Sequence, residues 1–171
     1  MKIFGSNRGI SLFIAVTIMG ILLLISYAVV NITIKGTQFA TSGRDSQYAY
    51  YAAESGIECA EYWDAKNDVF ATTTAGTILR CGDQSNIVGG QSMVSFGTST
   101  NTRIGGGGDT NQTSVFGLTF AAGTDGVGTC AVITVRKYYQ GSILKTYIKS
   151  RGYNTCAASS RRVERGIEVS Y

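Results

Sequence analysis

The sequence predicts an α+β protein in which one long N-terminal helix precedes an antiparallel sheet of three to four strands. Three observations indicate this fold class. An uncharged run, residues 10–30, continues without a proline into a more polar helical segment. The middle of the chain is rich in Gly, Ser and Thr, which is typical of loops. From about residue 114 onward, polar and apolar residues alternate as they do in half-buried strands.

The chain of 171 residues divides into four segments. Residues 1–9 form a short hydrophilic leader, residues 10–34 an apolar helix, and residues 35–66 an amphipathic continuation of that helix. Residues 67–171 form a single globular head, with variable loops first and the sheet last. About 135 residues after the apolar run suit one compact domain and leave no room for a second.

The apolar helix is long enough to cross a membrane. From residue 10 to residue 30 it would measure about 31 Å at about 1.5 Å per residue. The uncharged run is longer than the apolar stretch of a conventional cleaved signal peptide. Lys2 and Arg8 precede it and the next charge is Lys35, which gives a mild preference for a cytoplasmic N-terminus. The head would then lie outside the cytoplasm.

The second half of the helix carries a stripe of side chains at helical spacing. Tyr48, Ala52, Ser55, Cys59 and Tyr62 follow one another at intervals of four, three, four and three residues. Residues with these intervals share one face of a helix. The sequence therefore predicts that this stripe packs against the sheet.

The predicted sheet begins near residue 114 and centres on a hairpin. In SILKTYIKSR, Leu144, Thr146 and Ile148 alternate with more polar residues, so one face of the strand is expected to be buried. The segment CAVITVRKYY before it and VERGIEVSY after it have the same pattern. A turn at residues 140–141 joins the first two strands, and the third follows them.

The residue types exclude several kinds of site. The chain has no His, which removes Ser-His-Asp and Cys-His nucleophiles and metal sites that need imidazole. We therefore expect no enzyme activity, no metal and no cofactor. Four single cysteines without a CxxC pair indicate two disulfides in an oxidising compartment, with a thiolate metal site or reduced core thiols as alternatives. Pairing Cys59 with Cys81 and Cys130 with Cys156 suits the predicted elements, although two other pairings remain.

The hydrophilic leader ends in Arg8-Gly9, directly before the apolar helix. This arrangement resembles the class III leader of type IV pilin-like proteins. The resemblance implies that a prepilin peptidase cleaves after Gly9 and that the new N-terminal residue, Ile10, is N-methylated. An uncleaved single-pass anchor with a chance Arg-Gly pair is the alternative.

A second stretch of the helix carries the same resemblance. After Arg44-Asp45, the run YYAAESGIECAEYW is similar to the helix of PilX-type minor pilins. The resemblance rests on motifs over roughly residues 6–63, and over residues 114–171 on the order of elements alone, which is that of the pilin fold. One position departs from the pattern of major pilins, which have Glu as the fifth mature residue, where this chain has Ile14. The departure suits a minor pilin, or a subunit that initiates a filament or lies at its tip, better than the main repeating subunit. Loss of assembly is the alternative.

The resemblance implies a non-enzymatic subunit of a type IV pilus-like filament. Its partners would be other pilin subunits, the prepilin peptidase and an inner-membrane assembly platform. The chain would sit in the inner membrane with its head outside the cytoplasm and later join a cell-surface filament. A type II secretion pseudopilin and an uncleaved, membrane-anchored binding module are the alternative functions.

Charge is segregated along the chain. Residues 36–129 contain four basic and nine acidic residues, a net charge of −5, whereas residues 130–171 contain eight basic and two acidic, a net charge of +6. A basic strand face in the second segment is expected to be solvated, to pack against acidic patches such as residues 54–68 of neighbouring subunits, or to contact nucleic acid. This predicted basic face consists of Arg136, Lys145, Lys149 and Arg151, with Tyr138, Tyr147 and Tyr153 beside them.

Overall fold

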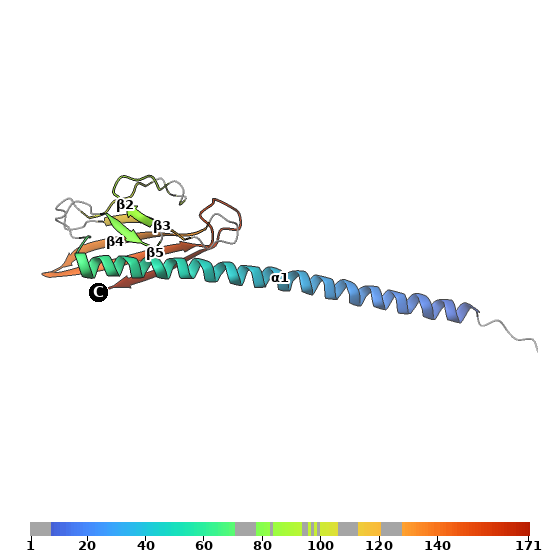
Figure 1. The fold of residues 1–171 in the computed structure, drawn as a ribbon. Coiled ribbons are helices and arrows are strands. Elements are labelled where there is room, and N and C mark those ends of the chain that lie inside the picture. The colour runs from blue at the N-terminus through green and yellow to red at the C-terminus, as the bar shows by residue number, and fades with distance from the viewer. Residues whose placement is uncertain are drawn as a thin grey trace, which may run out of the picture. The chain divides into compact units, whose positions relative to one another are not determined.

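The computed structural model describes residues 8–70, 78–82, 84–93, 96, 98, 100–105, 113–120 and 128–171. Most of the Gly-rich loop segments of the sequence lie outside these residues. The elements along the chain are α1 (Arg8–Asn67), β1 (Leu79–Cys81), β2 (Gln84–Ile87), β3 (Thr113–Phe120), β4 (Thr129–Gln140), β5 (Ile143–Tyr153) and β6 (Glu164–Ser170) (Figure 1). The predicted α+β arrangement, one long helix followed by an antiparallel sheet, is confirmed.

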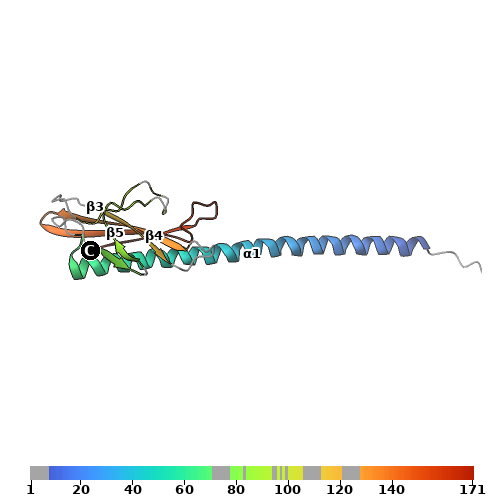
Figure 2. The same cartoon turned by 45° about the horizontal axis from the view of Figure 1, so that its top comes forward.

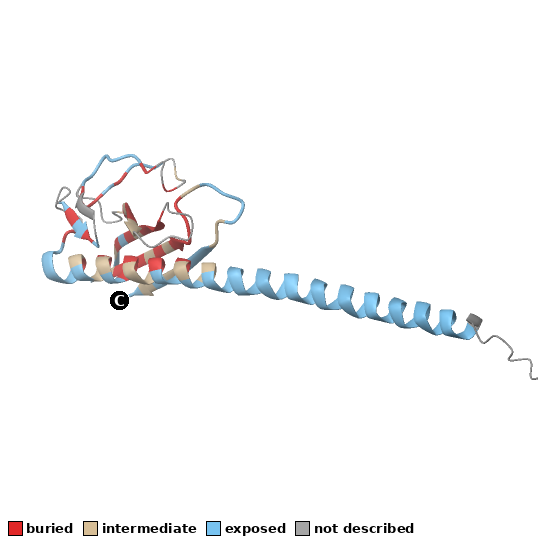
Figure 3. Ribbon diagram, turned by 45° about the vertical axis from the view of Figure 1, so that its right-hand side comes forward, coloured by how far each residue is buried: buried red, intermediate tan, exposed pale blue. Residues whose placement is uncertain are grey.

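The chain forms two compact units, Met1–Ser42 and Gly43–Tyr171. The boundary falls within α1, so the first unit contains the apolar part of the helix and the second contains its polar part together with all the strands. In the first unit every residue from Ile10 to Ser42 is exposed, as the pale blue colour in Figure 3 shows. These exposed residues form a candidate contact surface.

The head contains a four-stranded sheet with the order β3-β4-β5-β6. All neighbouring strands are antiparallel and consecutive in sequence. The β4–β5 hairpin turns at the predicted place, because Gln140 pairs with Ile143 and Gly141 has a φ of 65°, a conformation that glycine adopts readily. Figure 2 shows the long strands and the end of α1 as two layers of the head.

The face of α1 that contacts the sheet differs from the predicted stripe. Ala49, Ala53 and Ala60 are fully buried, whereas Tyr62 is 58% exposed. Of the predicted stripe only Ala52 is buried, and the buried face is rotated by about a third of a turn. The prediction was wrong because it gave weight to large side chains, whereas small ones let the helix approach the sheet closely.

A glycine of the sheet meets this small-residue face. A Cβ atom on Gly152 would overlap the backbone of Ala49 and Ala53, so only glycine leaves room for the helix at this position. A Cβ atom on Gly56 of α1 would likewise overlap the Ser150 hydroxyl and the Ile133 side chain of the sheet. The two layers are therefore in contact at backbone distance. The core between α1, the sheet and the β1–β2 pair consists of Ile57, Ala60, Val69, Phe70, Leu79, Cys81, Ile87, Ile104, Phe116, Leu118, Ala131, Ile133, Val135 and Ile148.

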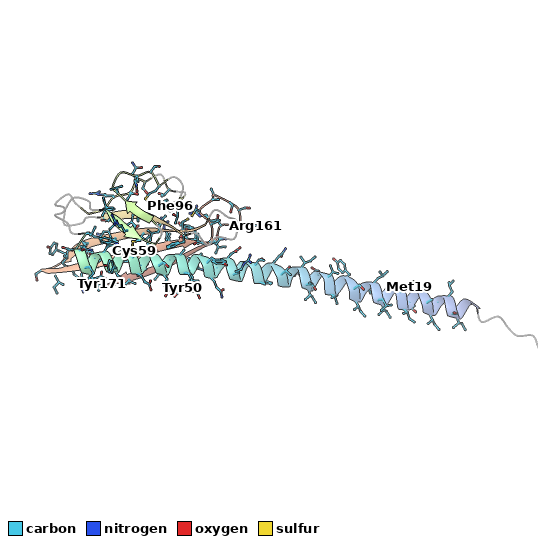
Figure 4. The ribbon with its side chains drawn as sticks, viewed as in Figure 1. Met19, Tyr50, Cys59, Phe96, Arg161 and Tyr171 are labelled. Carbon is cyan, nitrogen blue, oxygen red and sulfur yellow. A yellow bond between two sulfur atoms is a disulfide. The ribbon has the colours of Figure 1, made fainter. Side chains whose placement is uncertain are left out.

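A disulfide joins the end of α1 to β1, as one of the predicted pairings requires. Cys59 is bonded to Cys81 across a separation of 22 residues, and Figure 4 shows Cys59 on the head portion of α1. Close by, the Trp63 Nε1–H donates a hydrogen bond of 3.1 Å to the carbonyl oxygen of Arg80. These contacts fasten the β1–β2 pair to the helix.

Replacing Cys59 by Ser is expected to lower the free energy of unfolding by about 3 kcal/mol. Without the disulfide the unfolded chain is no longer constrained to a loop, so its conformational entropy rises. Chemical denaturation of the full chain in detergent micelles, followed by Trp63 fluorescence, measures the change. The double variant Cys59→Ser/Cys81→Ser serves as control and should lose the same amount. A loss well below 1 kcal/mol in both variants would contradict a stabilising disulfide.

Candidate functional site

The predicted processing site lies at the start of α1. The helix begins at Arg8, so the peptide bond between Gly9 and Ile10 lies in its first turn. Ile10 is 62% exposed. The leader residues before Arg8 lie outside the described residues. Cleavage after Gly9 and methylation of Ile10 therefore remain predictions.

The apolar part of α1 presents large hydrophobic side chains in every direction. The helix is long and apolar enough to cross a membrane, and the residues of its apolar stretch are not buried within the chain. Met19, labelled in Figure 4, shows how these side chains project from the helix. An exposed apolar surface of this size on a folded chain marks a surface for lipid or for another protein. Its members include Ile10, Leu12, Phe13, Ile14, Val16, Ile18, Ile21, Leu22, Leu23, Leu24, Ile25, Val29 and Val30.

Three hydroxyl groups of this part of the helix are bonded inside the helix. Thr17 donates to the carbonyl oxygen of Ile14 at 2.9 Å, and Ser26 donates to that of Leu22 at 2.8 Å. Thr33 donates to the carbonyl oxygen of Val29 in the same way. Because a polar group without a partner is costly in hydrocarbon, these bonds allow the helix to lie among lipids or apolar helices.

The other two cysteines lie side by side without being joined. Both are buried thiols, and a hydrogen bond with Cys156, together with burial, raises the pKa of the Cys130 thiol well above its ordinary value. The backbone amide of Cys156 donates to the carbonyl oxygen of Gly128 at 3.1 Å, which holds the two chain segments together. The second predicted disulfide therefore stays a prediction, with its two sulfur atoms already adjacent.

The predicted basic face is assembled on the side of the sheet that faces away from α1. Strand register pairs Arg136 with Tyr147 and Tyr138 with Lys145. Arg136 lies 5.3 Å from the centre of the Tyr138 ring, within the range of a cation–π contact. Lys145, Lys149 and Arg151 alternate along β5 with residues that point to the buried side, so the structure brings together the four basic residues Arg136, Lys145, Lys149 and Arg151.

Two details reduce the free charge and aromatic surface of this face. Lys149 forms an ion pair of 2.7 Å with Glu168 of β6. Hydrogen bonds from Lys149 and Tyr147 lower the pKa of Glu168, so this carboxylate stays charged and neutralises part of the face. The third predicted tyrosine, Tyr153, is buried beneath Arg162, whose guanidinium lies 3.7 Å from the ring centre.

Sequence reasoning missed a buried ion cluster at the end of α1. Lys137 of β4 lies 2.7 Å from Asp64, and both side chains are about 95% buried, with exposures of 6% and 5%. Asp68 accepts a second bond from Lys137 at 2.8 Å. Thr146 and Tyr171 donate their hydroxyls to Asp64 at 3.2 and 2.9 Å. Strand alternation in β4 could have predicted that Lys137 is buried, because Lys137 lies two residues after Val135 and therefore shares its buried face.

The described residues include no group of three or more His, Cys, Asp or Glu side chains that could hold a metal ion. The two surfaces described above are the apolar part of α1 and the basic face of the sheet. No family model, no curated protein and no solved structure matches this chain.

Proposed function

We propose that the chain is a non-enzymatic subunit of a type IV pilus-like filament, most similar to a PilX-type minor pilin. The observation that carries the proposal is the unbroken helix α1, whose apolar part is exposed all round while its polar part packs on the sheet of the head. Such a helix needs an apolar environment, which a membrane offers first and a bundle of equivalent helices offers later. The class III leader resemblance supports the same function.

In the proposed mechanism, cleavage after Gly9 leaves Ile10 as the first residue of the helix. The apolar part of α1 then leaves the lipid and packs against the same part of neighbouring subunits. Lipid tails are as apolar as these side chains, so packing contacts rather than release of water favour the exchange. Ile14 provides no carboxylate to pair with a neighbour's amino terminus, and we propose that this subunit is a minor component of the filament for that reason.

The proposal also gives the chain a location and partners. Before assembly the chain is a single-pass protein of the inner membrane, with its head outside the cytoplasm and its leader available to a prepilin peptidase. Afterwards it is part of a cell-surface filament that an inner-membrane platform assembles. The disulfide between Cys59 and Cys81 supports an oxidising location for the head.

Mass spectrometry of the N-terminal peptide, from protein made in its own host, tests the proposal. We expect a methylated peptide that begins at Ile10, and we expect the variant Gly9→Val to retain the leader completely. The matched control Gly5→Val changes a leader glycine away from the cleavage site and should be processed normally. A wild-type peptide that begins at Met1 would refute the proposal and indicate a fixed membrane anchor.

A type II secretion pseudopilin would share the leader, the helix and the processing. Surface filaments that are visible by electron microscopy, and lost when the protein is deleted, would separate a pilus subunit from a pseudopilin. An anchored binding module would differ from both, because its N-terminus would be neither cleaved nor methylated.

A further inference from the structure

We infer that the end of the head nearest Gly43 binds the phosphate groups of anionic phospholipids through Arg44, Arg161 and Arg165. The inference rests on the membrane location in the proposed function, because it says what the head contacts before assembly. It adds an electrostatic attachment to the apolar one that α1 provides. The argument uses the position, freedom and net charge of these arginines.

The first residues of β6 lie beside the start of the head portion of α1. The Nε of Arg165 donates a hydrogen bond of 2.7 Å to the hydroxyl oxygen of Ser46. Gly152, the cross-strand partner of Arg165, meets the backbone of α1 at the same level. At the other end of the strand, the hydroxyl of Tyr171 donates to Asp64. Arg165 therefore marks the end of the head where α1 enters it.

The loop between β5 and β6, residues 154–163, lies at this same end of the head. Asn154 closes the loop, because its side-chain oxygen accepts a hydrogen bond of 2.7 Å from the amide of Val163 and its Nδ2 donates to the carbonyl oxygen of Arg161 at 3.3 Å. Asn154 is only 3% exposed, so these bonds are shielded from water. Figure 4 shows Arg161 at the end of the head opposite to Tyr171. The loop thus fixes the position of Arg161.

The three arginines have guanidinium groups available to a ligand. Arg44, Arg161 and Arg165 are all exposed. Among the described residues, the side chains of Arg44 and Arg161 form no ion pair or hydrogen bond. Arg165 uses its Nε for Ser46, which leaves its two terminal amino groups. Arginine binds phosphate through parallel hydrogen bonds from its planar fork, so these side chains suit lipid phosphates.

Acidic groups in this region do not cancel its positive charge. Residues 43–46 and 154–165 contain four basic and two acidic residues, a net charge of +2. Of the two acidic residues, Asp45 is half-buried and Glu164 is a hydrogen-bond partner of Tyr153. The exposed arginines are therefore left to attract an anionic surface.

The chain also keeps these arginines close to the membrane surface. Lys35 is the first charge after the apolar run, and the next charge is Arg44. The nine residues between these positions rise by about 14 Å along α1. The headgroup layer covers about 6 Å of this distance, and the field of an anionic surface extends about 8 Å further at physiological salt. Lipid headgroups surround a spanning helix, so arginines on any side of it can meet them.

Arginine labelling of the full chain in lipid nanodiscs tests the inference. The reagent is phenylglyoxal, which modifies free guanidinium groups, and mass spectrometry gives the rate at each residue. We expect Arg44, Arg161 and Arg165 to react about fivefold or more slowly in discs of phosphatidylcholine mixed equally with phosphatidylglycerol than in discs of phosphatidylcholine alone. High salt should remove the difference, because it screens the charged surface.

Arg136 is the internal control of this experiment. It follows Ala131, the β4 partner of Gly152, by five residues, which places it about 17 Å farther along the sheet. Its labelling rate should be the same in both kinds of disc. The variant Arg136→Gln should likewise leave the protection of Arg161 unchanged.

A double variant provides the second measurement. Arg44→Gln combined with Arg161→Gln removes two cations without removing a side-chain contact of the described residues. The denaturant midpoint should therefore remain that of wild type. The remaining Arg165 should react nearly as fast in anionic discs as in neutral ones. Unchanged protection of Arg165 would contradict a shared lipid site.

The outcomes separate this inference from the proposed function. Equal labelling in both kinds of disc would overturn the inference, and a methylated Ile10 in the host protein would still leave the filament function intact. Equal protection by inorganic phosphate in neutral discs would also overturn it, because the site would then bind free phosphate rather than lipid. Protection by anionic lipid, in a chain that its host leaves beginning at Met1, would support the lipid contact while the filament function fails.

Discussion

Replacing Lys137 by Met is expected to lower the free energy of unfolding by about 3 kcal/mol, because a buried carboxylate would lose its counter-ion. Asp64 would remain 95% buried with only the hydroxyls of Thr146 and Tyr171 as donors. Because these two hydrogen bonds remain, we expect the loss of unfolding free energy to lie at the lower end of the range that is typical when one partner of a buried ion pair is removed. Denaturation of the full chain in detergent, followed by Trp63 fluorescence, measures it.

A double variant tells charge apart from packing. Lys137→Met together with Asp64→Asn removes both charges, while the amide oxygen still accepts hydrogen bonds from Thr146 and Tyr171. It should recover most of the stability, since a buried ion pair contributes little once both charges are removed. A double variant as unstable as Lys137→Met would show that the loss comes from packing and would refute this account.

The same cluster predicts how stability changes at high pH. Burial alone would lower the pKa of Lys137, but its hydrogen bonds to Asp64 and Asp68 outweigh burial and raise it above the ordinary value. Because the pKa of Lys137 is higher in the folded state, the contribution of Lys137 to the free energy of unfolding is complete below the pKa of the unfolded state, about 10.4. This contribution is lost as the pH rises through the pKa of the folded state. Burial, together with the hydrogen bond to Asp64, raises the pKa of Tyr171, so this residue also contributes stability that is lost at high pH. The difference between wild type and Lys137→Met should therefore be constant up to about pH 9 and shrink above the ordinary lysine pKa.

Replacing Gly152 by Ala is expected to cost about 3 kcal/mol, the upper end for overpacked cores. The new methyl group would overlap the backbone of Ala49 and Ala53, and a helix backbone cannot move aside as a side chain does. The helix would have to lift from β5, which would open the contact at Gly56 as well. The melting temperature and the denaturant midpoint of the full chain would both fall.

A second glycine of the same sheet is the matched control. On Gly166 of β6 a new Cβ atom would meet its nearest neighbour, the Ser150 carbonyl oxygen, at 3.9 Å, an ordinary contact. Gly166→Ala should therefore leave stability within about 0.5 kcal/mol of wild type, as most surface changes do. Equal losses in both variants would indicate a general effect of glycine replacement in strands rather than a close helix approach.

Periodicity in the sequence was sufficient for the main elements. The uncharged run and the helical segment after it form one helix. The alternation in residues 143–151 places Thr146 and Ile148 inside and the basic residues outside, whereas Leu144, expected inside, is 43% exposed near the hairpin turn. The basic face could be predicted because strand alternation has a period of two and strand neighbours follow from one hairpin turn. The Cys59–Cys81 pair could be proposed because it ties the end of the helix to the segment that follows, although the sequence left two other sets of pairings open.

The contact face of α1 and the ion cluster could not be predicted in the same way. A helix position can be buried because its side chain is large, or because it is small enough for the layers to touch, and Ala49 and Ala53 belong to the second case. Lys137 appeared as one of many basic residues, because the carboxylates that hold it come from a helix about 70 positions earlier in the chain. Only the packing of the two layers brings these groups together.

The disulfide between Cys59 and Cys81 also sets the path that a pulling force would take. Tension applied to the apolar end of α1 and to any point after Cys81 passes through the sulfur–sulfur bond and bypasses the residues between the two cysteines. About 70 Å of chain, at about 3.5 Å per extended residue, is therefore withheld from stretching. Under load, the end of α1 and the segment that leads into β1 cannot be drawn out into an extended thread until that bond is reduced.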